Sequence, residues 1–325
     1  MNIDLKAIRM QGALHGMRET RDADHLIVHS EQSLFAIVWA ALENTPEKLA
    51  APLGPKGPGK LVATGVAVDN AWVVDPKSQR VLLAREGEFD SIDPWGQVQP
   101  QKIKVPGLPV GTFAAAVDSD GLHVLVVVVR DINPDVSNYA IALADLTSGR
   151  LIREGTIGSG ADLELLWDGH FGAWVIGDTS RGALWRWDGQ RPAVKLAGPA
   201  GHVHSATFAA TAEGVIVSVI AAKTAGETVL VIGHAERDRV VWADPATLTG
   251  SPVLMAWRDP ARPLWACLAQ AGAAQQIQFR DVGGKLLAEA AVRPGVHLAN
   301  LQWSVFPNRV WGVGIRALAA VALSG

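Results

Sequence analysis

Short apolar runs alternate with turn-forming residues along most of the chain, and tryptophans mark several of these runs. Trp257 and Trp265 lie eight positions apart with Asp-Pro between them, and Trp303 and Trp311 repeat that spacing 46 residues later with Pro-Asn between them. Two aromatic residues at this spacing on either side of a turn are typical of an antiparallel β-hairpin. The pattern therefore predicts hairpins that recur at a fixed period.

The same strand, turn and strand order recurs in units without a tryptophan pair. One unit places residues 66–68 before the turn Asp69-Asn70 and residues 71–74 after it. The second strands of the seven units are centred near Leu26, Trp72, Val124, Trp174, Val217, Trp265 and Trp311. Apolar third strands follow at 34–39, 80–84, 139–144, 183–187, 228–232, 275–279 and 318–323.

Steps of 43 to 52 residues between short strands predict an all-β fold, a β-propeller, and most simply one of seven four-stranded blades. Six blades are the alternative if the weak N-terminal unit is something else. The last unit ends after its third strand, so residues 3–9 are expected to supply the fourth and close the ring. The prediction is a single domain over residues 1–325. An amphipathic helix over Ser33–Ala51 is the alternative for that segment, weakened by Pro46.

One region departs from the repeat, and we interpret residues 86–108 as an insert. Loops on a rigid scaffold often carry binding groups, and tryptophan is enriched at interaction hot spots. We therefore predict that Phe89, Asp90, Asp93 and Trp95 contact a protein partner. The alternative is that Phe89 and Trp95 fold back on the blade as a small hydrophobic cluster.

Several short motifs carry a family resemblance. Gly201-His202 precedes a strand, and Asp118-Ser119-Asp120-Gly121 fits the turn of a first hairpin. Trp187-Asp188 and Trp242-Ala243-Asp244 close third strands. The chain thus resembles the degenerate members of the WD-repeat-like β-propeller superfamily, although no unit carries the full motif set.

That resemblance implies a rigid hub for protein partners, since most such propellers act in this way, while a minority are hydrolases, lyases or lectins. Some bacterial propellers of this degenerate kind are associated with an AAA+ ATPase and a von Willebrand A-domain protein. The resemblance therefore implies a bacterial multi-protein system of that type as one setting for this chain.

Composition narrows the function classes further. A net charge of −3 argues against a nucleic-acid partner, and a single cysteine excludes internal disulfides. The longest apolar run, Val124–Val129, is far too short to cross a membrane, and residues 1–6 do not begin a secretory signal. We therefore predict a cytoplasmic protein with no membrane partner.

Two patterns in the sequence are compatible with a metal site, and each has a simpler interpretation. His202 and His204 have a spacing that can chelate zinc, but a third ligand, such as His15, His123 or His297, would have to come from elsewhere in the fold.

Asp131, Asn133 and Asp135 alternate as in a calcium loop. Val136 and Ala142 stand where that loop normally has glycine and glutamate. We expect two ordinary histidines and an acidic turn.

No frame for a catalytic nucleophile is apparent: Gly158-Ser159-Gly160 lacks the surrounding motif, and Cys267 lies in an apolar strand. We therefore predict a non-enzymatic interaction scaffold that needs no cofactor. The alternative is a propeller enzyme or a small-ligand or carbohydrate-binding module that uses the central channel, with a metal as one option. A channel lined by three or more His, Asp or Glu residues would favour the alternative.

Overall fold

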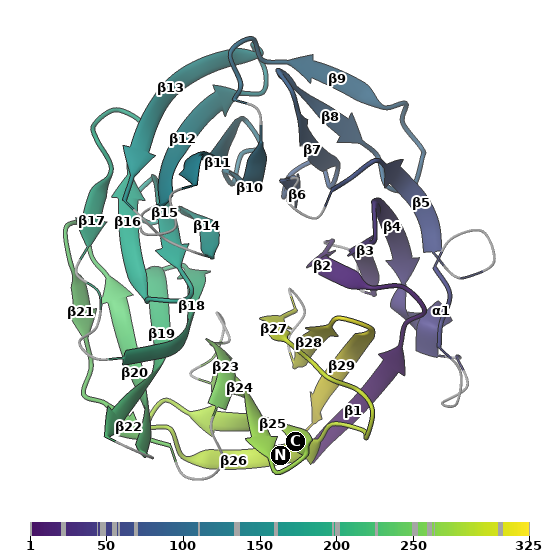
Figure 1. Cartoon of the computed structure of the whole chain (residues 1–325), viewed down its shortest axis with the longest axis vertical. Coiled ribbons are helices and arrows are strands. Elements are labelled where there is room, and N and C mark those ends of the chain that lie inside the picture. The colour runs from purple at the N-terminus through teal and green to yellow at the C-terminus, as the bar shows by residue number, and fades with distance from the viewer. Residues whose placement is uncertain are drawn as a thin grey trace.

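The computed structural model describes the chain except at a limited number of positions. The described residues are 2–20, 24–43, 45, 50–53, 57, 59–67, 71–109, 111–132, 137–158, 162–196, 198, 202–224, 227–248, 253–258, 262, 264–304 and 308–324. Their strands form seven separate sheets arranged in a ring, which Figure 1 shows from one face.

Each blade is an antiparallel sheet of four successive strands, with one further short strand in blade 5, and its first strand lies next to the axis of the ring. Blade 1 contains β2 (Leu14–Glu19), β3 (His25–Ser30), β4 (Ser33–Val38) and β5 (Gly59–Thr64). Blade 2 contains β6 (Trp72–Val74), β7 (Val81–Arg85), β8 (Glu88–Ile92) and β9 (Gln101–Lys104). Blade 3 contains β10 (Thr112–Val117), β11 (His123–Ile132), β12 (Ser137–Asp145) and β13 (Arg150–Ile157). Blade 4 contains β14 (Leu163–Asp168), β15 (Ala173–Asp178), β16 (Ala183–Trp187) and β17 (Val194–Leu196).

The remaining three blades follow the same order. Blade 5 contains β18 (His202–Thr211), β19 (Gly214–Thr224), β20 (Glu227–Ala235) and β21 (Val240–Trp242), and β22 (Ala246–Thr247) also pairs with β20. Blade 6 contains β23 (Val253–Arg258), β24 (Leu264–Ala271), β25 (Ala274–Asp281) and β26 (Leu286–Ala291). Blade 7 contains β27 (Asn300–Trp303), β28 (Arg309–Gly314), β29 (Ala317–Ser324) and β1 (Asn2–Arg9).

The first strand of the chain closes the ring. β1 pairs antiparallel with β29 in an unbroken register from Asn2↔Ser324 to Arg9↔Ala317. The two ends of the chain therefore lie side by side in Figure 1. Closure removes the open edge that β29 would otherwise present to solvent. The predicted seven-bladed propeller, with its last blade completed by the N-terminal strand, is confirmed, and six blades are excluded.

The core is divided among the junctions between blades. Seven clusters of buried apolar side chains are present among the described residues, and each combines residues from two neighbouring blades. Trp174, Trp265 and Trp311 are buried in three different clusters, and Trp72 is half-buried at a fourth. Burial of large aromatic surface therefore stabilises the ring through its junctions.

The structure corrects the sequence interpretation of blade 2. Residues 72–74 form its first strand, not its second, so every later strand of the blade moves by one place. Much of the range 86–108, interpreted as an insert, is regular blade: it contains the third strand β8, a turn at 93–100 and the fourth strand β9. The strand β6 has only three residues, which made its apolar run easy to assign to the wrong position.

The segment 33–51 combines parts of both expectations. β4 covers residues 33–38 as predicted, and a five-residue helix, α1 (Trp39–Glu43), follows it. A continuous helix from Ser33 is therefore wrong. Among the residues that the structure describes, no helix has the length and apolar character needed to cross a membrane.

Candidate functional site

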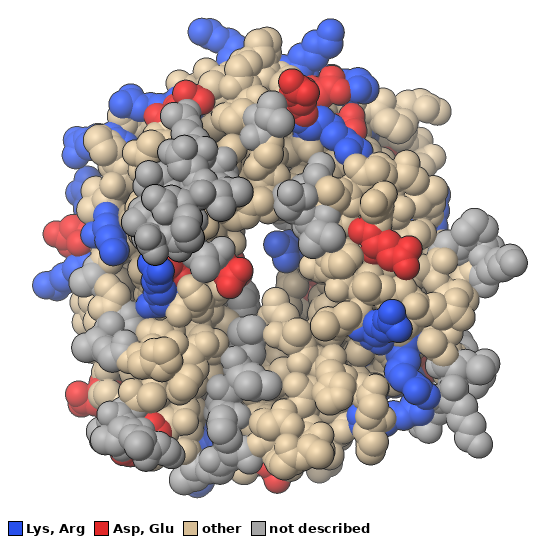
Figure 2. Space-filling view, viewed as in Figure 1, with Lys and Arg blue, Asp and Glu red and all other residues tan. Residues whose placement is uncertain are grey.

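The first strands of the blades surround a channel along the axis of the ring, and Figure 2 looks into its open mouth. Two adjoining cavities, of about 450 Å³ and about 410 Å³, form this channel. They meet at a level lined in both by Arg18, Ala115, Glu164, Leu165, Asn300, Leu301 and Gln302. Cavities of this size suit a small molecule, so the channel is the candidate ligand site.

Arg18 projects from β2 of blade 1 into the channel. Its guanidinium lies 5.8 Å from the centre of the Trp72 ring, and its Nη1 donates a hydrogen bond of 3.3 Å to the Met17 carbonyl. The side chain is exposed to the channel, and the channel walls around it reduce its access to bulk water. Burial therefore lowers the pKa of Arg18, and the charge of Glu164 opposes that shift. The group stays cationic, because an arginine in a protein does not lose its proton.

Glu164 projects from β14 of blade 4 at the same level of the channel. Burial raises the pKa of its carboxyl to about 7, although the charge of Arg18 and the backbone amide of Phe208 both oppose the shift. Near neutral pH this carboxyl thus exchanges between its protonated and ionised forms. Its neighbours along β14 are Leu163 and Leu165, so it is an isolated carboxyl in an apolar strand.

A histidine and tryptophan cluster lies beside the larger cavity. His29 is buried, and its Nε2 donates a 3.0 Å hydrogen bond to the Val66 carbonyl. Its ring packs edge-on against His15 at 5.2 Å and against Trp72 at 6.4 Å between centres. Burial lowers the pKa of His29, the Val66 carbonyl opposes that shift, and His15 adds to it. His29 therefore supports the channel wall as a neutral residue at physiological pH.

The predicted metal ligands do not form a site in the described part of the structure. His202 and His204 are exposed on β18, with ring centres 5.3 Å apart. Asp131 lies in β11, while Asn133 and Asp135 lie outside the described residues. No group of three or more His, Cys, Asp or Glu side chains suited to a metal ion is found among the residues described.

The channel lining only partly resembles the enzyme-like funnel considered from the sequence. Three such residues, His15, His29 and Glu164, do line it, but they do not converge: Glu164 lies on blade 4, across the ring from the two histidines of blade 1, and His29 is bonded to the Val66 carbonyl. Cys267 is remote from this chemistry: burial raises the pKa of its thiol to about 12, which keeps it protonated.

The four residues predicted to contact a partner occupy different environments in blade 2. Phe89 is 1% exposed inside the junction with blade 3, so its side chain has no surface to offer, and its assignment to partner binding is corrected. Trp95 is half-buried and packs edge-on against His25, with ring centres 4.5 Å apart. Asp90 pairs with Arg85 at 3.1 Å. For Asp90, Asp93 and Trp95 partner contact stays a prediction.

Asp93 stabilises the turn that follows β8. Its carboxylate accepts hydrogen bonds from the backbone N–H groups of Trp95 at 2.9 Å and Val98 at 2.8 Å. Desolvation would raise the pKa of this carboxyl, but these amides, that of Gln97 and the charge of Arg80 together lower it. Asp93 therefore fixes the shape of the turn 93–100.

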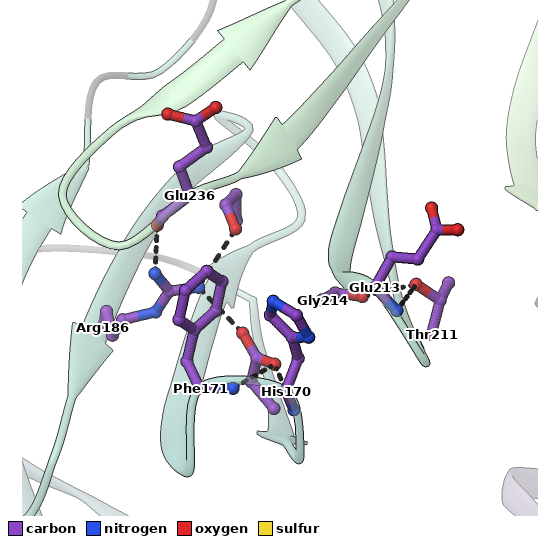
Figure 3. Close-up of polar contacts among 9 residues, drawn as sticks. His170, Phe171, Arg186, Thr211, Glu213, Gly214 and Glu236 are labelled. Atoms are coloured by element: carbon purple, nitrogen blue, oxygen red, sulfur yellow. Dashed lines mark hydrogen bonds and ion pairs between the residues drawn. The ribbon is translucent and has the colours of Figure 1, made fainter.

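A buried ion pair within blade 4 joins Arg186 to Asp168, and Arg186 also reaches blade 5 through the Glu236 carbonyl (Figure 3). Arg186 Nη2 lies 2.8 Å from Asp168 Oδ2 and also donates to the Ala235 carbonyl at 3.2 Å. The guanidinium lies 4.4 Å from the centre of the Phe171 ring. The two charges contact each other and fixed protein groups of blade 5, so this network acts as a clamp at the junction of blades 4 and 5.

Comparisons with known proteins identify the fold. No family model matches the sequence, and no curated protein matches it. Among solved structures, the chain is similar to the β-propeller domain of Cps50 (Swd1) from Myceliophteria thermophila. The TM-score is 0.65 at 11% identity, over 99% of this chain and 100% of that one. The comparison supports a β-propeller fold. At this identity the likeness shows the fold alone, so function must be argued from the site.

The sequence interpretation missed both channel charges. Arg18 and Glu164 lie on different blades, and no motif joins them. The one available signal was a lone carboxyl within the apolar run Leu163-Glu164-Leu165-Leu166 of a first strand. A polar residue at such a position is costly to bury unless it has a partner.

Proposed function

We propose that this protein is a non-enzymatic interaction scaffold that presents the turn 93–100 of blade 2 to a protein partner. The observation that carries the proposal is an exposed apolar residue on a firmly anchored turn. Val98 is 51% exposed at a position where Asp93 holds its backbone N–H. Rigid presentation of an apolar side chain lowers the entropy cost of binding.

The anchoring of this turn extends across two blades. Lys60, on β5 of blade 1, donates a hydrogen bond to the Trp95 carbonyl. Trp95 also packs against the apolar cluster between blades 1 and 2, and Pro94 beside it is buried. The turn has eight residues, whereas the turns between the third and fourth strands of blades 3, 5 and 6 have four. It is therefore longer than the turns of those three blades while staying fixed to the ring.

The propeller fold supports an interaction role of this general kind, and the partner is not identified by the fold. Assembly with an AAA+ ATPase and a von Willebrand A-domain protein in a bacterial system stays a prediction, and none of the comparisons supports it. A cytoplasmic location and the exclusion of a nucleic-acid partner likewise rest on composition and charge alone.

The test compares partner recovery by matched variants of the tagged full chain from its native lysate. Val98→Glu places a charge on the proposed surface, and Ile152→Glu places the same charge at a 47% exposed site on β13 of blade 3. We expect one protein to be recovered in constant proportion with the wild type and with I152E, and at least about tenfold less with V98E. Equal recovery with V98E would reject the turn as the surface. Recovery of no protein above the untagged control would reject the scaffold role.

A further inference from the structure

Two opposite charges face each other across the channel without forming an ion pair. Arg18 comes from blade 1 and Glu164 from blade 4, which stand on opposite sides of a seven-bladed ring, and both line the level where the two cavities meet. Each feels the electrostatic field of the other. Among the described residues, no contact of 4.0 Å or less joins a nitrogen of Arg18 to an oxygen of Glu164. A gap therefore separates them.

Both groups keep unused hydrogen-bonding capacity in that gap. A guanidinium has five N–H donors, and Arg18 directs one of them to the Met17 carbonyl. A carboxylate has about four acceptor positions, and the Phe208 amide is the backbone donor beside Glu164. Charged groups held in confined surroundings are costly unless they are paired. The channel thus contains a cation and an anion that do not pair with each other and that each keep hydrogen-bonding positions for a ligand.

The charges decide which ligand class completes this arrangement. A dianion would be repelled by Glu164, a dication would be repelled by Arg18, and an apolar molecule would leave both charges unpaired. A molecule with one anionic and one cationic end satisfies both walls at once. The amide side chains of Asn300 and Gln302 line the same level, where they offer donors and acceptors to the middle of such a molecule.

We propose that the channel binds a small zwitterion of the amino-acid type, with its carboxylate on Arg18 and its ammonium on Glu164. The larger cavity would hold an apolar side chain of the ligand, because Leu14, Leu163 and Val313 are among its lining residues. Its volume of about 450 Å³ accommodates a free amino acid or a dipeptide. This site is separate from the turn 93–100, so it does not depend on the proposed scaffold function.

The test titrates the full chain with zwitterions and with analogues that carry only one charge. The probes are leucine, the dipeptide glycyl-leucine, N-acetyl-leucine (anion only) and leucinamide (cation only). Binding is measured by calorimetry and thermal shift at about pH 7.5, where most of Glu164 is ionised and most of the probes' amino groups are still protonated. We expect at least one zwitterion to bind saturably and both single-charge analogues to bind about tenfold more weakly or worse.

Variants of the two charges assign each end of the ligand. Arg18→Gln should weaken the zwitterion at least about tenfold and abolish any preference for N-acetyl-leucine, while residual leucinamide binding persists. Glu164→Gln should also weaken the zwitterion at least about tenfold. It should abolish any preference for leucinamide, while residual N-acetyl-leucine binding persists. Binding of leucinamide by R18Q, and of N-acetyl-leucine by E164Q, also shows that the channel of each variant is still folded. Arg150→Gln and Glu213→Gln, at exposed positions outside the channel, are the matched controls and should bind like the wild type.

Three results would overturn the proposal. One is that no zwitterion binds the wild-type chain saturably. Another is that the single-charge analogues bind as well as the zwitterions, which would make one charge sufficient. The third is that R18Q and E164Q bind zwitterions like the control variants, which would place the ligand elsewhere. None of these results bears on the turn 93–100, because V98E changes a different surface.

Discussion

Two pairs of opposite charges in this molecule show how distance and surroundings decide the role of a side chain. Arg186 and Asp168 are in contact, both nearly inaccessible, and held by further hydrogen bonds from blade 5. Arg18 and Glu164 face an open channel and do not touch. The first pair is complete and stabilises a junction, whereas the second pair is available for an added partner.

Replacing Glu164 by Gln should change how stability depends on pH. The folded pKa is about 7 against an ordinary value of 4.5, so between these values the folded chain holds a proton that the unfolded chain releases. The contribution of Glu164 to the free energy of unfolding is therefore fully present below about pH 4.5 and is lost as the pH rises to about 7. The loss is at most about 3 kcal/mol. Urea unfolding at several pH values should show wild type losing stability relative to E164Q over this interval.

The comparison with E164Q isolates this carboxyl from the other titrating groups around the channel. His29 acts with the opposite sign: its pKa is lowered by burial, so its contribution is present above its ordinary value of 6.5 and is lost as the pH falls. Wild type and E164Q share His29, so its effect largely cancels in the difference. Parallel stability curves for the two proteins would contradict the raised pKa.

Arg186→Met should destabilise the ring strongly. It leaves the Asp168 carboxylate, whose side chain is 0% exposed, without its cation, and breaking a buried pair in this way costs about 3–5 kcal/mol. The double variant R186M with Asp168→Asn should recover part of that loss, because no unpaired charge remains. Arg239→Met is the control, since Arg239 pairs with Glu236 on the surface. Equal unfolding midpoints for R186M and R239M would show that the clamp does not stabilise the junction.

Within the blades, the recurring element is a carboxylate at the end of the third strand. Asp93, Asp145, Asp188 and Asp281 each accept hydrogen bonds from two backbone N–H groups of the turn that follows. The pattern explains why Trp187-Asp188 was recognisable in the sequence, because the aspartate shapes the turn and the tryptophan fills the junction. It also explains Asp93 without reference to any partner.

Asp188→Ala should therefore lower stability by about 1–2 kcal/mol, since two turn amides at 2.8 and 2.9 Å lose their acceptor. Asp188→Asn should retain most of that stability, because its side-chain oxygen still accepts a hydrogen bond. The amides lower the pKa of Asp188, so its charge-dependent contribution is present above its ordinary value of 3.8 and is lost as the pH falls further. Chemical unfolding of the two variants checks both statements. A D188N loss as large as that of D188A would mean that charge, not the acceptor, stabilises the turn.

The sequence predicted most elements because the repeat and the turn residues agree with each other. It failed in blade 2, where β6 has three residues and Val66 belongs to the packing between blades 1 and 2 rather than to a first strand. A one-strand shift there made β8 and β9 look like an insert. The channel pair was out of reach for a different reason. Arg18 and Glu164 become neighbours only when the ring closes, and a repeat period does not specify which side chains meet across its axis.

For the whole molecule, stability depends on joining blade 7 to blade 1. Ser304 on blade 7 donates a 2.6 Å hydrogen bond to Glu19, and Arg309 pairs with Asp24. Trp39 packs edge-on against Trp311 at 5.2 Å between ring centres. These contacts join residues from opposite ends of the chain, so they form only when the ring is complete. The junction between blades 7 and 1 therefore forms only when the first and last parts of the chain meet and close the ring.

Deleting residues 2–9 should lower the thermal midpoint sharply and cause self-association. The deletion removes the fourth strand of blade 7, leaves β29 with an unpaired edge, and uncovers the apolar cluster that Ile3, Leu5 and Ala7 pack against. Unpaired edges with apolar flanks recruit other chains. Size-exclusion chromatography should therefore show oligomers where the wild type does not, and thermal unfolding should start earlier.

Point variants test whether the deletion acts through the apolar side chains of β1 rather than only through the missing strand. Side chains of β1 alternate, so Leu5 faces the cluster and Lys6 faces solvent. Leu5→Asp should reproduce most of the deletion effect, whereas Lys6→Asp should change little. A synthetic peptide of residues 1–10 added to the deleted chain should restore the thermal midpoint, because the edge of β29 selects that strand by register. If the deleted chain stays monomeric and equally stable, the first strand does not close the ring in solution, and the remaining junctions alone hold the seven blades together.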